Sequence, residues 1–462
     1  MKIPDNVKLI HSILRHGNYE CYLVGGCVRD FLLGENPHDY DLCTNALPET
    51  IVEVLKRNNI SVTTVGFDYG TIVAHFENEE YEITTYRKET GYSDKRHPDK
   101  VEYGSSIIED LKRRDFTMNA MAYNLDSKEI VDPYQGLFDL KNKTIKMVGN
   151  PVERIDEDPV RILRALRFAI KYHFQIEDRT KKAILNNKNL LDFVSKERIT
   201  QEMEKMLTCG QPIEGIFMEF PTVIFQIVPE LEPCYKFEQK SKYHRHDVYE
   251  HLLNVVDLCE TNSFEIKLAA LLHDIGKPHV FTVDNDGRGH FYGHADVSYD
   301  ISKAALTKDF RITARQYSFI LQLIKEHDHE MPITRRTIRK FANEFEEDFI
   351  ESWLVLKKAD VQDHIYLKTE KLALKDKYDL MLKEYNNFLE EETRTTLKDL
   401  SVNGKDIMGL GVSEGKEIGI VLHSLLDMVL NDDVCNNKDD LLSAAKKIIC
   451  KEDRDEISFD FE

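Results

Sequence analysis

The sequence has no apolar run of 18 residues, so it lacks the kind of segment that crosses a membrane as a helix. Its first residues, MKIPDNVKLIHSILRHG, have neither the apolar core nor the small-residue cleavage site of a secretory signal. Its eight cysteines include no C-x-x-C pair, which argues against a zinc site or a disulfide framework. Together these absences predict a cytoplasmic protein with reduced thiols.

Positive charge is also scarce. The 62 lysines and arginines are outnumbered by 82 aspartates and glutamates, and the net charge of −20 at first argues against a nucleic-acid-binding protein. The charge is unevenly distributed, however, because residues 141–200 hold 14 basic and 8 acidic side chains. A local basic surface near residue 170 is therefore compatible with an acidic whole. The length of 462 residues predicts two to four domains.

The pattern of apolar residues changes near residue 150. Before it, strands, turns and short helices alternate, and TIVAHF and YEITTYR on either side of ENEE predict a β-hairpin. The polar stretch TGYSDKRHPDKVEYG, residues 90–104, is expected to be a mobile loop. After it, apolar residues recur at spacings of three and four, which predicts helices to the end of the chain.

The stretch VGGCVRDFLLGENPHDYDLCT, residues 24–44, combines a glycine turn with clustered acids. Gly25 and Gly26 fit a strand-to-helix turn whose N–H groups can approach a phosphate, and Arg29 could add a charge-assisted bond. Asp39 and Asp41 are expected on one strand, where alternate residues share a face. Two like charges there repel unless a cation lies between them, and Mg²⁺ takes carboxylates together with substrate phosphates.

More candidates for this first site follow along the chain. Glu82, in YEITTYR, is a possible third carboxylate on a neighbouring strand, and EDLKRRDFTMNAMAY supplies a second polar cluster of Arg113, Arg114, Asp115 and Asn119. Each motif alone has a simpler explanation: glycine turns occur in many folds, and D-x-D is common as a solvated pair or a calcium-binding edge. Their combination is what points to a nucleotide and metal site.

The stretch EDPVRILRALRF predicts a helix with an unusual basic face. Asp158 fits the N-cap before Pro159 in the first turn. Arg161, Arg164 and Arg167 recur every three residues along one ridge, while intervening apolar residues are available for packing. A surface helix with a basic stripe is the simpler alternative.

A second constellation lies between residues 243 and 365. Histidine and carboxylate side chains on helices suit a transition metal or another divalent ion, unidentified from sequence. The ligand candidates are His251, His273, Asp274, His294, His327 and Asp360. A single His-Asp pair is usually a polar helix end, but this ordered set resembles the HD phosphohydrolase domain. Lys277 would then contact phosphate. The alternative is a vestigial or structural metal site. In either case His294 and His327 could complete a site for two metals, and without one of them the site would hold one.

The motifs LVGGCVRDFLLG…HDYDLCT, RRDFTMNAMAY, DPYQGLFDL, EDPVRILRALRFA and SKERI resemble, in order and spacing, those of the class II (bacterial-type) tRNA nucleotidyltransferase and poly(A) polymerase family. The resemblance implies an α+β protein, with a polymerase β-like nucleotidyltransferase head followed by an all-helical neck, HD domain and tail. The expected ranges are 1–145 for the head, 146–235 for the neck, 240–370 for the HD domain and 371–462 for the tail. Gly404 and Gly409 would set helix breaks in a tail that contacts tRNA.

The resemblance also implies roles for particular residues. Asp39 and Asp41 would be catalytic and hold Mg²⁺, and the nucleotide would contact Gly26, Arg29, Arg114, Asp158, Arg161, Arg164 and Arg167. The residues themselves add Glu82 as a further catalytic carboxylate and Gly25, Asp115 and Asn119 as further nucleotide contacts. Substrates would be CTP, ATP and tRNA, and no membrane is involved.

Base choice has a chemical explanation in the pair Asp158 and Arg161. Arginine only donates hydrogen bonds and ionised aspartate only accepts them, which matches the pairing edges of cytosine and adenine. Uracil and guanine have a carbonyl in place of that amino group, so an acceptor would face the aspartate carboxylate and both would stay unpaired. The main prediction is a CCA-adding enzyme, and an A-adding enzyme or poly(A) polymerase is the nearest alternative. Further alternatives are a chain that acts mainly as an HD phosphohydrolase, or one that only binds tRNA.

Overall fold

The computed structural model describes residues 3–455, except 38, 77–78, 105, 347, 392–395, 413–414 and 431–432. The chain divides into two compact units, Met1–Pro233 with Ala304–Thr313, and Cys234–Lys303 with Ala314–Glu462. Over the described ranges, no helix is both long enough and apolar enough to cross a membrane.

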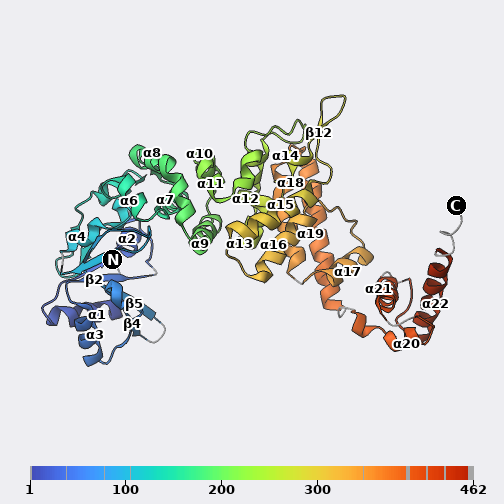
Figure 1. Cartoon of the computed structure of the whole chain (residues 1–462), viewed down its shortest axis with the longest axis horizontal. Coiled ribbons are helices and arrows are strands. Elements are labelled where there is room, and N and C mark those ends of the chain that lie inside the picture. Colours follow the sequence, from blue (N-terminus) through green and yellow to red (C-terminus); the bar gives the residue numbers. More distant parts are fainter. Residues whose placement is uncertain are drawn as a thin grey trace. The chain divides into compact units, whose positions relative to one another are not determined.

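A seven-stranded mixed sheet forms the centre of the head, drawn in blue in Figure 1. Its strand order is β3-β4-β5-β2-β1-β8-β9, and β2 and β5 are parallel while the other neighbours are antiparallel. The strands are β1 (Cys21–Val24), β2 (Asp41–Thr44), β3 (Ser61–Thr63), β4 (Thr71–Phe76), β5 (Glu79–Thr85), β8 (Ala122–Asn124) and β9 (Ile130–Val131). The antiparallel pairing of β4 with β5 confirms the predicted hairpin.

The segment expected to be a mobile loop instead forms a two-stranded ribbon. Strand β6 (Arg87–Thr90) pairs antiparallel with β7 (Lys100–Tyr103). The polar residues that suggested a loop satisfy one another: the Asp99 carboxylate accepts bonds from Ser93 N–H and O–H, and Asp99 N–H donates to Gly91 C=O. Turn-forming residues thus close the ribbon, which is why composition alone misled the prediction.

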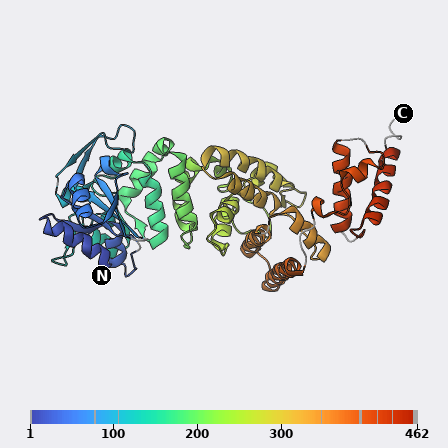
Figure 2. The same cartoon turned by 90° about the horizontal axis from the view of Figure 1, so that it is seen from below.

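Short helices cover the sheet, and Figure 2 shows the dark blue ones against it. They are α1 (Asp5–His16), α2 (Gly26–Leu32), α3 (Pro48–Arg57), α4 (Ile107–Lys112) and α5 (Gly136–Lys141). One core cluster joins β1, β2 and α4 through fully or nearly fully buried side chains, among them Val24, Cys43 and Leu111. This packing fixes the strand ends that carry the candidate site.

The neck consists of helices that follow the head directly: α6 (Pro151–Glu157), α7 (Arg161–Tyr172), α8 (Asp178–Asn187), α9 (Lys196–Leu207), α10 (Glu214–Glu219) and α11 (Pro221–Ile227). The expected start of the basic helix was wrong, because α7 begins at Arg161 rather than after an Asp158 cap. Asp158 instead ends α6, and its Oδ1 accepts from Val160 N–H in a turn between the two helices. An aspartate at a helix start and one at a turn give the same sequence signal.

The second unit holds the HD helices and the tail. The former are α12 (Val248–Leu258), α13 (Phe264–Leu272), α14 (Lys277–Val280), α15 (His294–Asp309), α16 (Ala314–Glu326), α17 (Arg335–Glu344), α18 (Phe349–Asp363) and α19 (Lys368–Glu391). Only the part of α15 up to Lys303 belongs to this unit. The expected boundary at 370/371 falls inside α19, which packs on α18. The tail helices α20 (Gly404–Met408), α21 (Lys416–Leu430) and α22 (Lys438–Asp455) have their own apolar core. Gly409 follows the last residue of α20, as predicted, whereas Gly404 lies inside the helix as its first residue and Asn403 caps it.

Two short strand pairs interrupt the region expected to be all helical. In the first unit β10 (Thr144–Ile145) pairs in parallel with β11 (Gln175–Ile176), and in the second β12 (Thr282–Val283) pairs with β13 (Gly289–His290). Strands of two residues are too short to show the alternation of apolar and polar residues by which a strand is predicted from sequence.

Candidate functional site

The glycine turn between β1 and α2 brings backbone close to a half-buried arginine. Gly25 has φ +75, and a Cβ built on it would lie 2.8 Å from Arg114 Nη1 and 3.8 Å from Asp41 Oδ2. A side chain at this position would therefore be strained and would also displace Arg114. Gly26 begins α2. The turn sits where the predicted phosphate contact requires it, beside both an arginine and a carboxylate.

Three carboxylates lie close enough at the adjacent strand ends to affect one another. Burial raises the pKa of Asp41 to about 6; Arg114 opposes the shift, and the negative charges of Glu82 and Asp39 add to it. Asp41 begins β2, and Glu82 lies on the parallel neighbour β5, where Leu42 pairs with Ile83. Repulsion among clustered acids is the electrostatic setting that a divalent cation relieves, so the residues fit such an ion.

Asp39 differs in position from the prediction. It is exposed and precedes β2, which starts at Asp41, so the two aspartates do not share a strand. Asp39 and Tyr40 lie outside any helix or strand, and the Tyr40 side chain is buried beside the start of β2. The position of Asp39 is therefore not set by the register of β2.

A partly buried ion pair and a chain of hydrogen bonds join the head to the basic helix α7. Asp115 Oδ2 accepts from Arg164 Nε and Nη2 at 2.8 and 2.6 Å, and its Oδ1 accepts from Asn119 Nδ2 at 3.0 Å. Asn119 Oδ1 in turn accepts from Arg29 Nη1 at 2.6 Å. Arg29 also lies 5.2 Å from the centre of the Phe168 ring. These contacts hold two predicted nucleotide-binding arginines in fixed positions.

This network predicts how stability depends on pH. Burial would raise the pKa of Asp115, but Arg164 and the bond from Asn119 outweigh it and lower the pKa to about 2. A lowered carboxyl pKa stabilises the fold above its unfolded value of 3.8, and this contribution is lost as pH falls toward 2. We expect Asp115→Asn to lower the free energy of unfolding at pH 7 by about 2 kcal/mol, with the difference from the parent shrinking below pH 4. Denaturant titrations of both proteins between pH 7 and 3 test this, with exposed Asp178→Asn as the control.

The structure places Asp158 and Arg161 next to each other but gives their side chains different partners. Asp158 accepts two bonds from Arg198, at 2.9 and 2.7 Å. Arg161 Nη1 donates to Arg154 C=O and to Glu157 Oε2, both at 2.7 Å. Arg161 Nη2 donates to the Arg113 carbonyl at 3.2 Å. Three of the five N–H groups of Arg161 are thus engaged within the described structure, and two are left for a ligand.

A cleft of about 550 Å³ gathers all ten predicted nucleotide-binding residues. Arg167 lines it, paired with Glu202 at 2.7 Å and lying 4.4 Å from the Phe168 ring centre. Asp41 lines it as well, whereas Asp39 and Glu82 do not. Sequence reasoning assigned no role to five further lining residues: Arg113, Phe168, Lys171, Arg198 and Lys205. The SKERI motif, which includes Arg198, was the available signal for one of them.

A second cavity of about 410 Å³ adjoins the cleft and shares Arg113, Asp158, Arg161 and Arg198 with it. The ribbon β6–β7 supplies its other wall. Here the buried Glu89 accepts from Arg87 Nε at 2.7 Å, from Arg113 Nη1 at 3.4 Å and from Tyr92 O–H at 2.6 Å. Although burial acts to raise it, the Arg113 and Arg87 cations hold the pKa of Glu89 below its usual range.

Glu89 therefore keeps two like charges together beside Arg161. We expect Glu89→Ala to lower kcat/KM for the reaction at the cleft by about tenfold or more, because the loss of this carboxylate leaves Arg87 without its ion pair and Arg113 with Asp110 alone. Steady-state assays should show this loss, whereas Lys88→Ala, at the exposed neighbouring position of β6, should act like the parent. Equal kinetics for the two variants would contradict a role of the ribbon in holding Arg113.

In the second unit the six predicted HD residues come together around one buried carboxylate. The Nε2 atoms of His251, His273, His294 and His327 lie 3.1 to 3.4 Å from the oxygens of Asp274. Asp360 Oδ1 lies 3.3 Å from His251 Nε2. The ligand atoms form two groups that share Asp274, one with His251 and His273 and one with His294 and His327.

A hydrogen bond from Nδ1, the ring nitrogen that points away from Asp274, fixes the orientation of each of the four imidazole rings. Nδ1 of His273, His294 and His327 donates to backbone carbonyls at 2.8, 2.8 and 2.6 Å, and Nδ1 of His251 donates to Asp363 at 2.7 Å. A proton on Nδ1 leaves a lone pair on each Nε2, facing the Asp274 carboxylate. In the described part of the chain, His251 Nε2, His273 Nε2 and Asp274 Oδ1 are buried without a hydrogen-bond partner. Because the Nε2 lone pairs and the Asp274 oxygens are all acceptors, a metal cation between them would satisfy both.

Two neighbours complete this centre. Lys277 Nζ lies 2.5 Å from Asp274 Oδ2 and 3.1 Å from Gln239 Oε1, so the predicted phosphate contact does reach the centre. Asp363 was missed by sequence reasoning. Its spacing of three from Asp360 places both on one face of α18, which is the signal that could have found it.

Comparison with known proteins agrees with this order of parts. Residues 21–146 match the family described as Poly A polymerase head domain, residues 173–234 match the one described as Probable RNA and SrmB- binding site of polymerase A, and residues 248–364 match the HD domain. These matches, with the structural likeness below, confirm the α+β class with a polymerase-type head, helical regions and an HD domain.

Individual relatives agree as well. A CCA-adding enzyme of Enterococcus faecalis is 44% identical over 50% of this chain and 56% of its own length. One from Ligilactobacillus salivarius is 31% identical over 97% of this chain and 98% of its own. A solved Bacillus stearothermophilus CCA-adding enzyme in complex with CTP superposes with a TM-score of 0.68 at 25% identity, over 98% of this chain and 100% of that one. The chain therefore belongs to the family of CCA-adding enzymes, as the resemblance of its motifs implied.

Proposed function

We propose that this protein is a CCA-adding tRNA nucleotidyltransferase, which adds C, C and A from CTP and ATP to tRNA 3′ ends. The observation that carries the proposal is the single cleft in which the glycine turn, Asp41 and the arginines of α7 converge. The family to which the chain belongs and the CTP complex of the Bacillus stearothermophilus relative support it. We propose the division into head, neck, HD domain and tail on the same basis.

In the reaction, the 3′-oxygen of the RNA forms a bond to the α-phosphorus, the α–β phosphoanhydride breaks, and pyrophosphate leaves. Asp39 and Asp41, with Glu82 nearby, would hold Mg²⁺, which when bound lowers the pKa of the attacking hydroxyl and stabilises the leaving group. The turn at Gly25 and Gly26 lets backbone approach the triphosphate, and Arg114 neutralises its charge. Because the phosphoryl group needs positioning and charge stabilisation, no covalent protein intermediate is required.

Base selection would use the two N–H groups of Arg161 that its structural partners leave. Two donors match the two acceptors on the pairing edge of cytosine, and one of them matches the ring acceptor of adenine. Asp158 keeps one acceptor position after its bonds to Arg198 and Val160, enough for the amino group that both bases carry. A carbonyl in that place, as in uracil and guanine, would face the carboxylate unpaired. Asp158 and Arg161 would thus each bond the base separately, without forming an ion pair with each other.

The RNA would lie along the basic side of the cleft. Lys171, Arg198 and Lys205 line it on helices α7 and α9 of the neck, within the 60-residue segment of basic excess and just beyond it. Their phosphate contacts would hold the tRNA end without reading its sequence. The tail would make a further contact with the tRNA.

An incorporation assay tests the activity directly. Transcripts that end before CCA, after CC, or after the complete CCA receive labelled CTP or ATP with Mg²⁺, separately and together. Ordered addition of two C and one A, with no addition to the complete end, is expected. Addition of A alone to the CC end would make the protein an A-adding enzyme, and long A tails would make it a poly(A) polymerase.

The HD centre supports a second activity, a metal-dependent phosphohydrolase acting on RNA ends or nucleotides. The buried, unpartnered His251 Nε2, His273 Nε2 and Asp274 Oδ1 are the observation that favours it. A divalent ion held there would activate water for attack on a phosphoester. Lys277 would then bind the substrate phosphate beside the ion.

We expect His273→Gln to lose most of the bound metal and the hydrolysis of phosphomonoesters and cyclic phosphodiesters, because a ligand is removed from a buried centre. CCA addition should stay within about twofold of the parent, since the substitution is confined to the second unit. Metal content by mass spectrometry after loading with Mn²⁺, Co²⁺, Ni²⁺ or Zn²⁺ gives a readout independent of activity. His279→Gln, an exposed histidine on α14, is the matched control, and full metal retention by His273→Gln would contradict the ligand assignment.

A further inference from the structure

A cavity of about 620 Å³ lies in the second unit, away from the HD centre. Helices α18 and α19, drawn side by side in orange in Figure 1, form its two walls, and the end of α12 closes one side. Its lining combines apolar side chains with a positive rim of four lysines: Lys358, Lys368, Lys371 and Lys375. We call this cavity the α18–α19 groove.

The groove is held open by bonds that cross it. Lys358 Nζ on α18 lies 2.5 Å from Asp379 Oδ1 on α19, and Lys371 Nζ on α19 donates to the Gln362 carbonyl on α18 at 2.5 Å. These two links fix the separation of the helices at two levels. A site with walls fixed in advance loses little conformational entropy on binding, as is usual for small-molecule pockets.

The other two lysines have a different status. Lys368 and Lys375 are seven residues apart, so they project from the same face of α19, and both are exposed. Among the residues that the structure describes, neither is in an ion pair with a carboxylate. Beneath them lie Ala359, 1% exposed, and Tyr378, 3% exposed, with Leu372 at the edge. Unpaired positive charge over an apolar floor is complementary to an anion with a flat apolar body.

We propose that the α18–α19 groove binds a nucleoside phosphate at a site separate from the catalytic cleft. The phosphates would pair with Lys368 and Lys375, and the base would cover the apolar floor. Two polar side chains of the lining suit the edge of an amino-bearing base: the Gln362 amide both donates and accepts, and the Glu260 carboxylate accepts. The volume also falls in the range of pockets that hold ligands of nucleotide size.

Place in the fold suggests why such a site would matter. On α18, Val355, Ala359 and Gln362 line the groove, while Asp360 and Asp363 reach the HD centre from the other side of the same helix. A nucleotide in the groove would therefore pack against the helix that positions the HD carboxylates. Binding of a nucleotide in the α18–α19 groove requires no reaction at the catalytic cleft or at the HD centre.

Equilibrium dialysis of the full chain with labelled ATP and Mg²⁺ tests the proposal, because the catalytic cleft and the groove together predict two nucleotides per chain. The double variant Lys368→Glu/Lys375→Glu should bind one, with affinity for the second reduced at least tenfold, and should retain CCA addition. Leu372→Trp, which fills the edge of the groove without changing its charge, should give the same loss. Lys383→Glu, an exposed lysine further along α19, is the control and should bind two.

Three results would overturn the proposal. The first is one nucleotide per chain in the parent protein, and the second is two nucleotides in every variant. The third comes from competition: if tripolyphosphate displaces the second nucleotide as well as ATP does, or if dodecanoate occupies the groove and ATP does not displace it, the site does not recognise a nucleoside phosphate.

Discussion

Asp41→Ala should reduce the incorporation of C and A by about 10³-fold or more, equivalent to about 4 kcal/mol of transition-state stabilisation. Asp41 is the carboxylate at the start of β2 that lines the nucleotide cleft, and its own pKa of about 6 reflects burial with Glu82 and Asp39 nearby. Removing it deprives a bound cation of its most buried ligand. Single-turnover assays on a CC-ended transcript would measure the loss.

The variant should fail in chemistry rather than in folding. A raised carboxyl pKa means that ionisation of Asp41 costs stability in the folded chain, and this cost is fully present above pH 6. Asp41→Ala should therefore melt no lower than the parent at pH 7.5 without Mg²⁺, and it should still bind tRNA. Glu129→Ala, an exposed acid of the head, should keep full activity; activity retained by Asp41→Ala would refute its catalytic role.

Arg161→Ala should lower the preference for C and A over U and G by about 100-fold or more, because the donors that match the accepted bases are removed. Arg161 is held by bonds to Arg154, Glu157 and Arg113, which leave two of its N–H groups for a base. Competition assays with all four nucleotides on one transcript would give the ratio. Arg179→Ala, an exposed arginine of the neck, should leave that ratio unchanged.

Arg161→Lys separates base reading from charge. Lysine retains the positive charge but has three donors in place of the planar five, so it cannot hold three acceptors and still present two bonds. We expect its selectivity to resemble that of Arg161→Ala even where its rate recovers. Selectivity close to that of the parent would show that charge alone is sufficient and would contradict the proposed reading of the base edge.

Motifs of fixed residue type predicted the site better than local geometry did. The HD ligands converge because each lies at a helix end or on a helix face that packing brings inward, and the residue types alone revealed them. Asp158 and Asp39 were assigned to the right neighbourhood but to the wrong element, since one ends α6 and the other precedes β2. Aspartate favours caps, turns and strand ends alike, so its presence does not settle which of these it occupies.

Residues that act through partners distant in sequence were beyond reach. Nothing in the stretch 87–103 indicates that Glu89 lies between Arg87 and Arg113, because Arg113 is 24 positions further along. The same holds for Arg198, which meets Asp158 across 40 positions. Such pairs follow from tertiary packing, which a local pattern does not encode.

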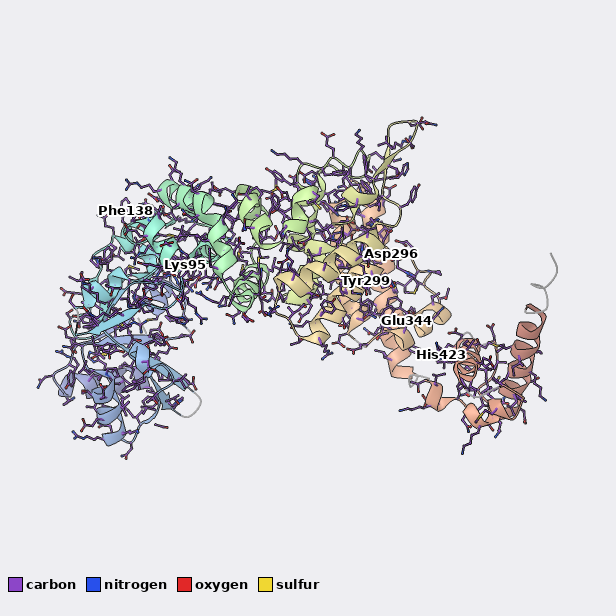
Figure 3. The ribbon with its side chains drawn as sticks, in the orientation of Figure 1. Lys95, Phe138, Asp296, Tyr299, Glu344 and His423 are labelled. Atoms are coloured by element: carbon purple, nitrogen blue, oxygen red, sulfur yellow. The ribbon has the colours of Figure 1, made fainter. Side chains whose placement is uncertain are left out.

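The short β10–β11 pairing has a mechanical consequence. It joins residue 145 of the head to residue 176 beyond α7, while Arg164 binds Asp115 and Arg161 binds the Arg113 carbonyl from the same helix. Lys95, at the tip of the ribbon and labelled in Figure 3, pairs with Asp156 on the preceding helix α6 at 2.6 Å. At the end of α7, the Tyr172 O–H donates to Asp30 Oδ1 at 3.1 Å. Helix α7 is thus bonded to the head at its first turn and at its last residue. We therefore expect the change from accepting C to accepting A to involve side-chain rotation and the lengthened RNA end rather than a movement of α7 relative to the head.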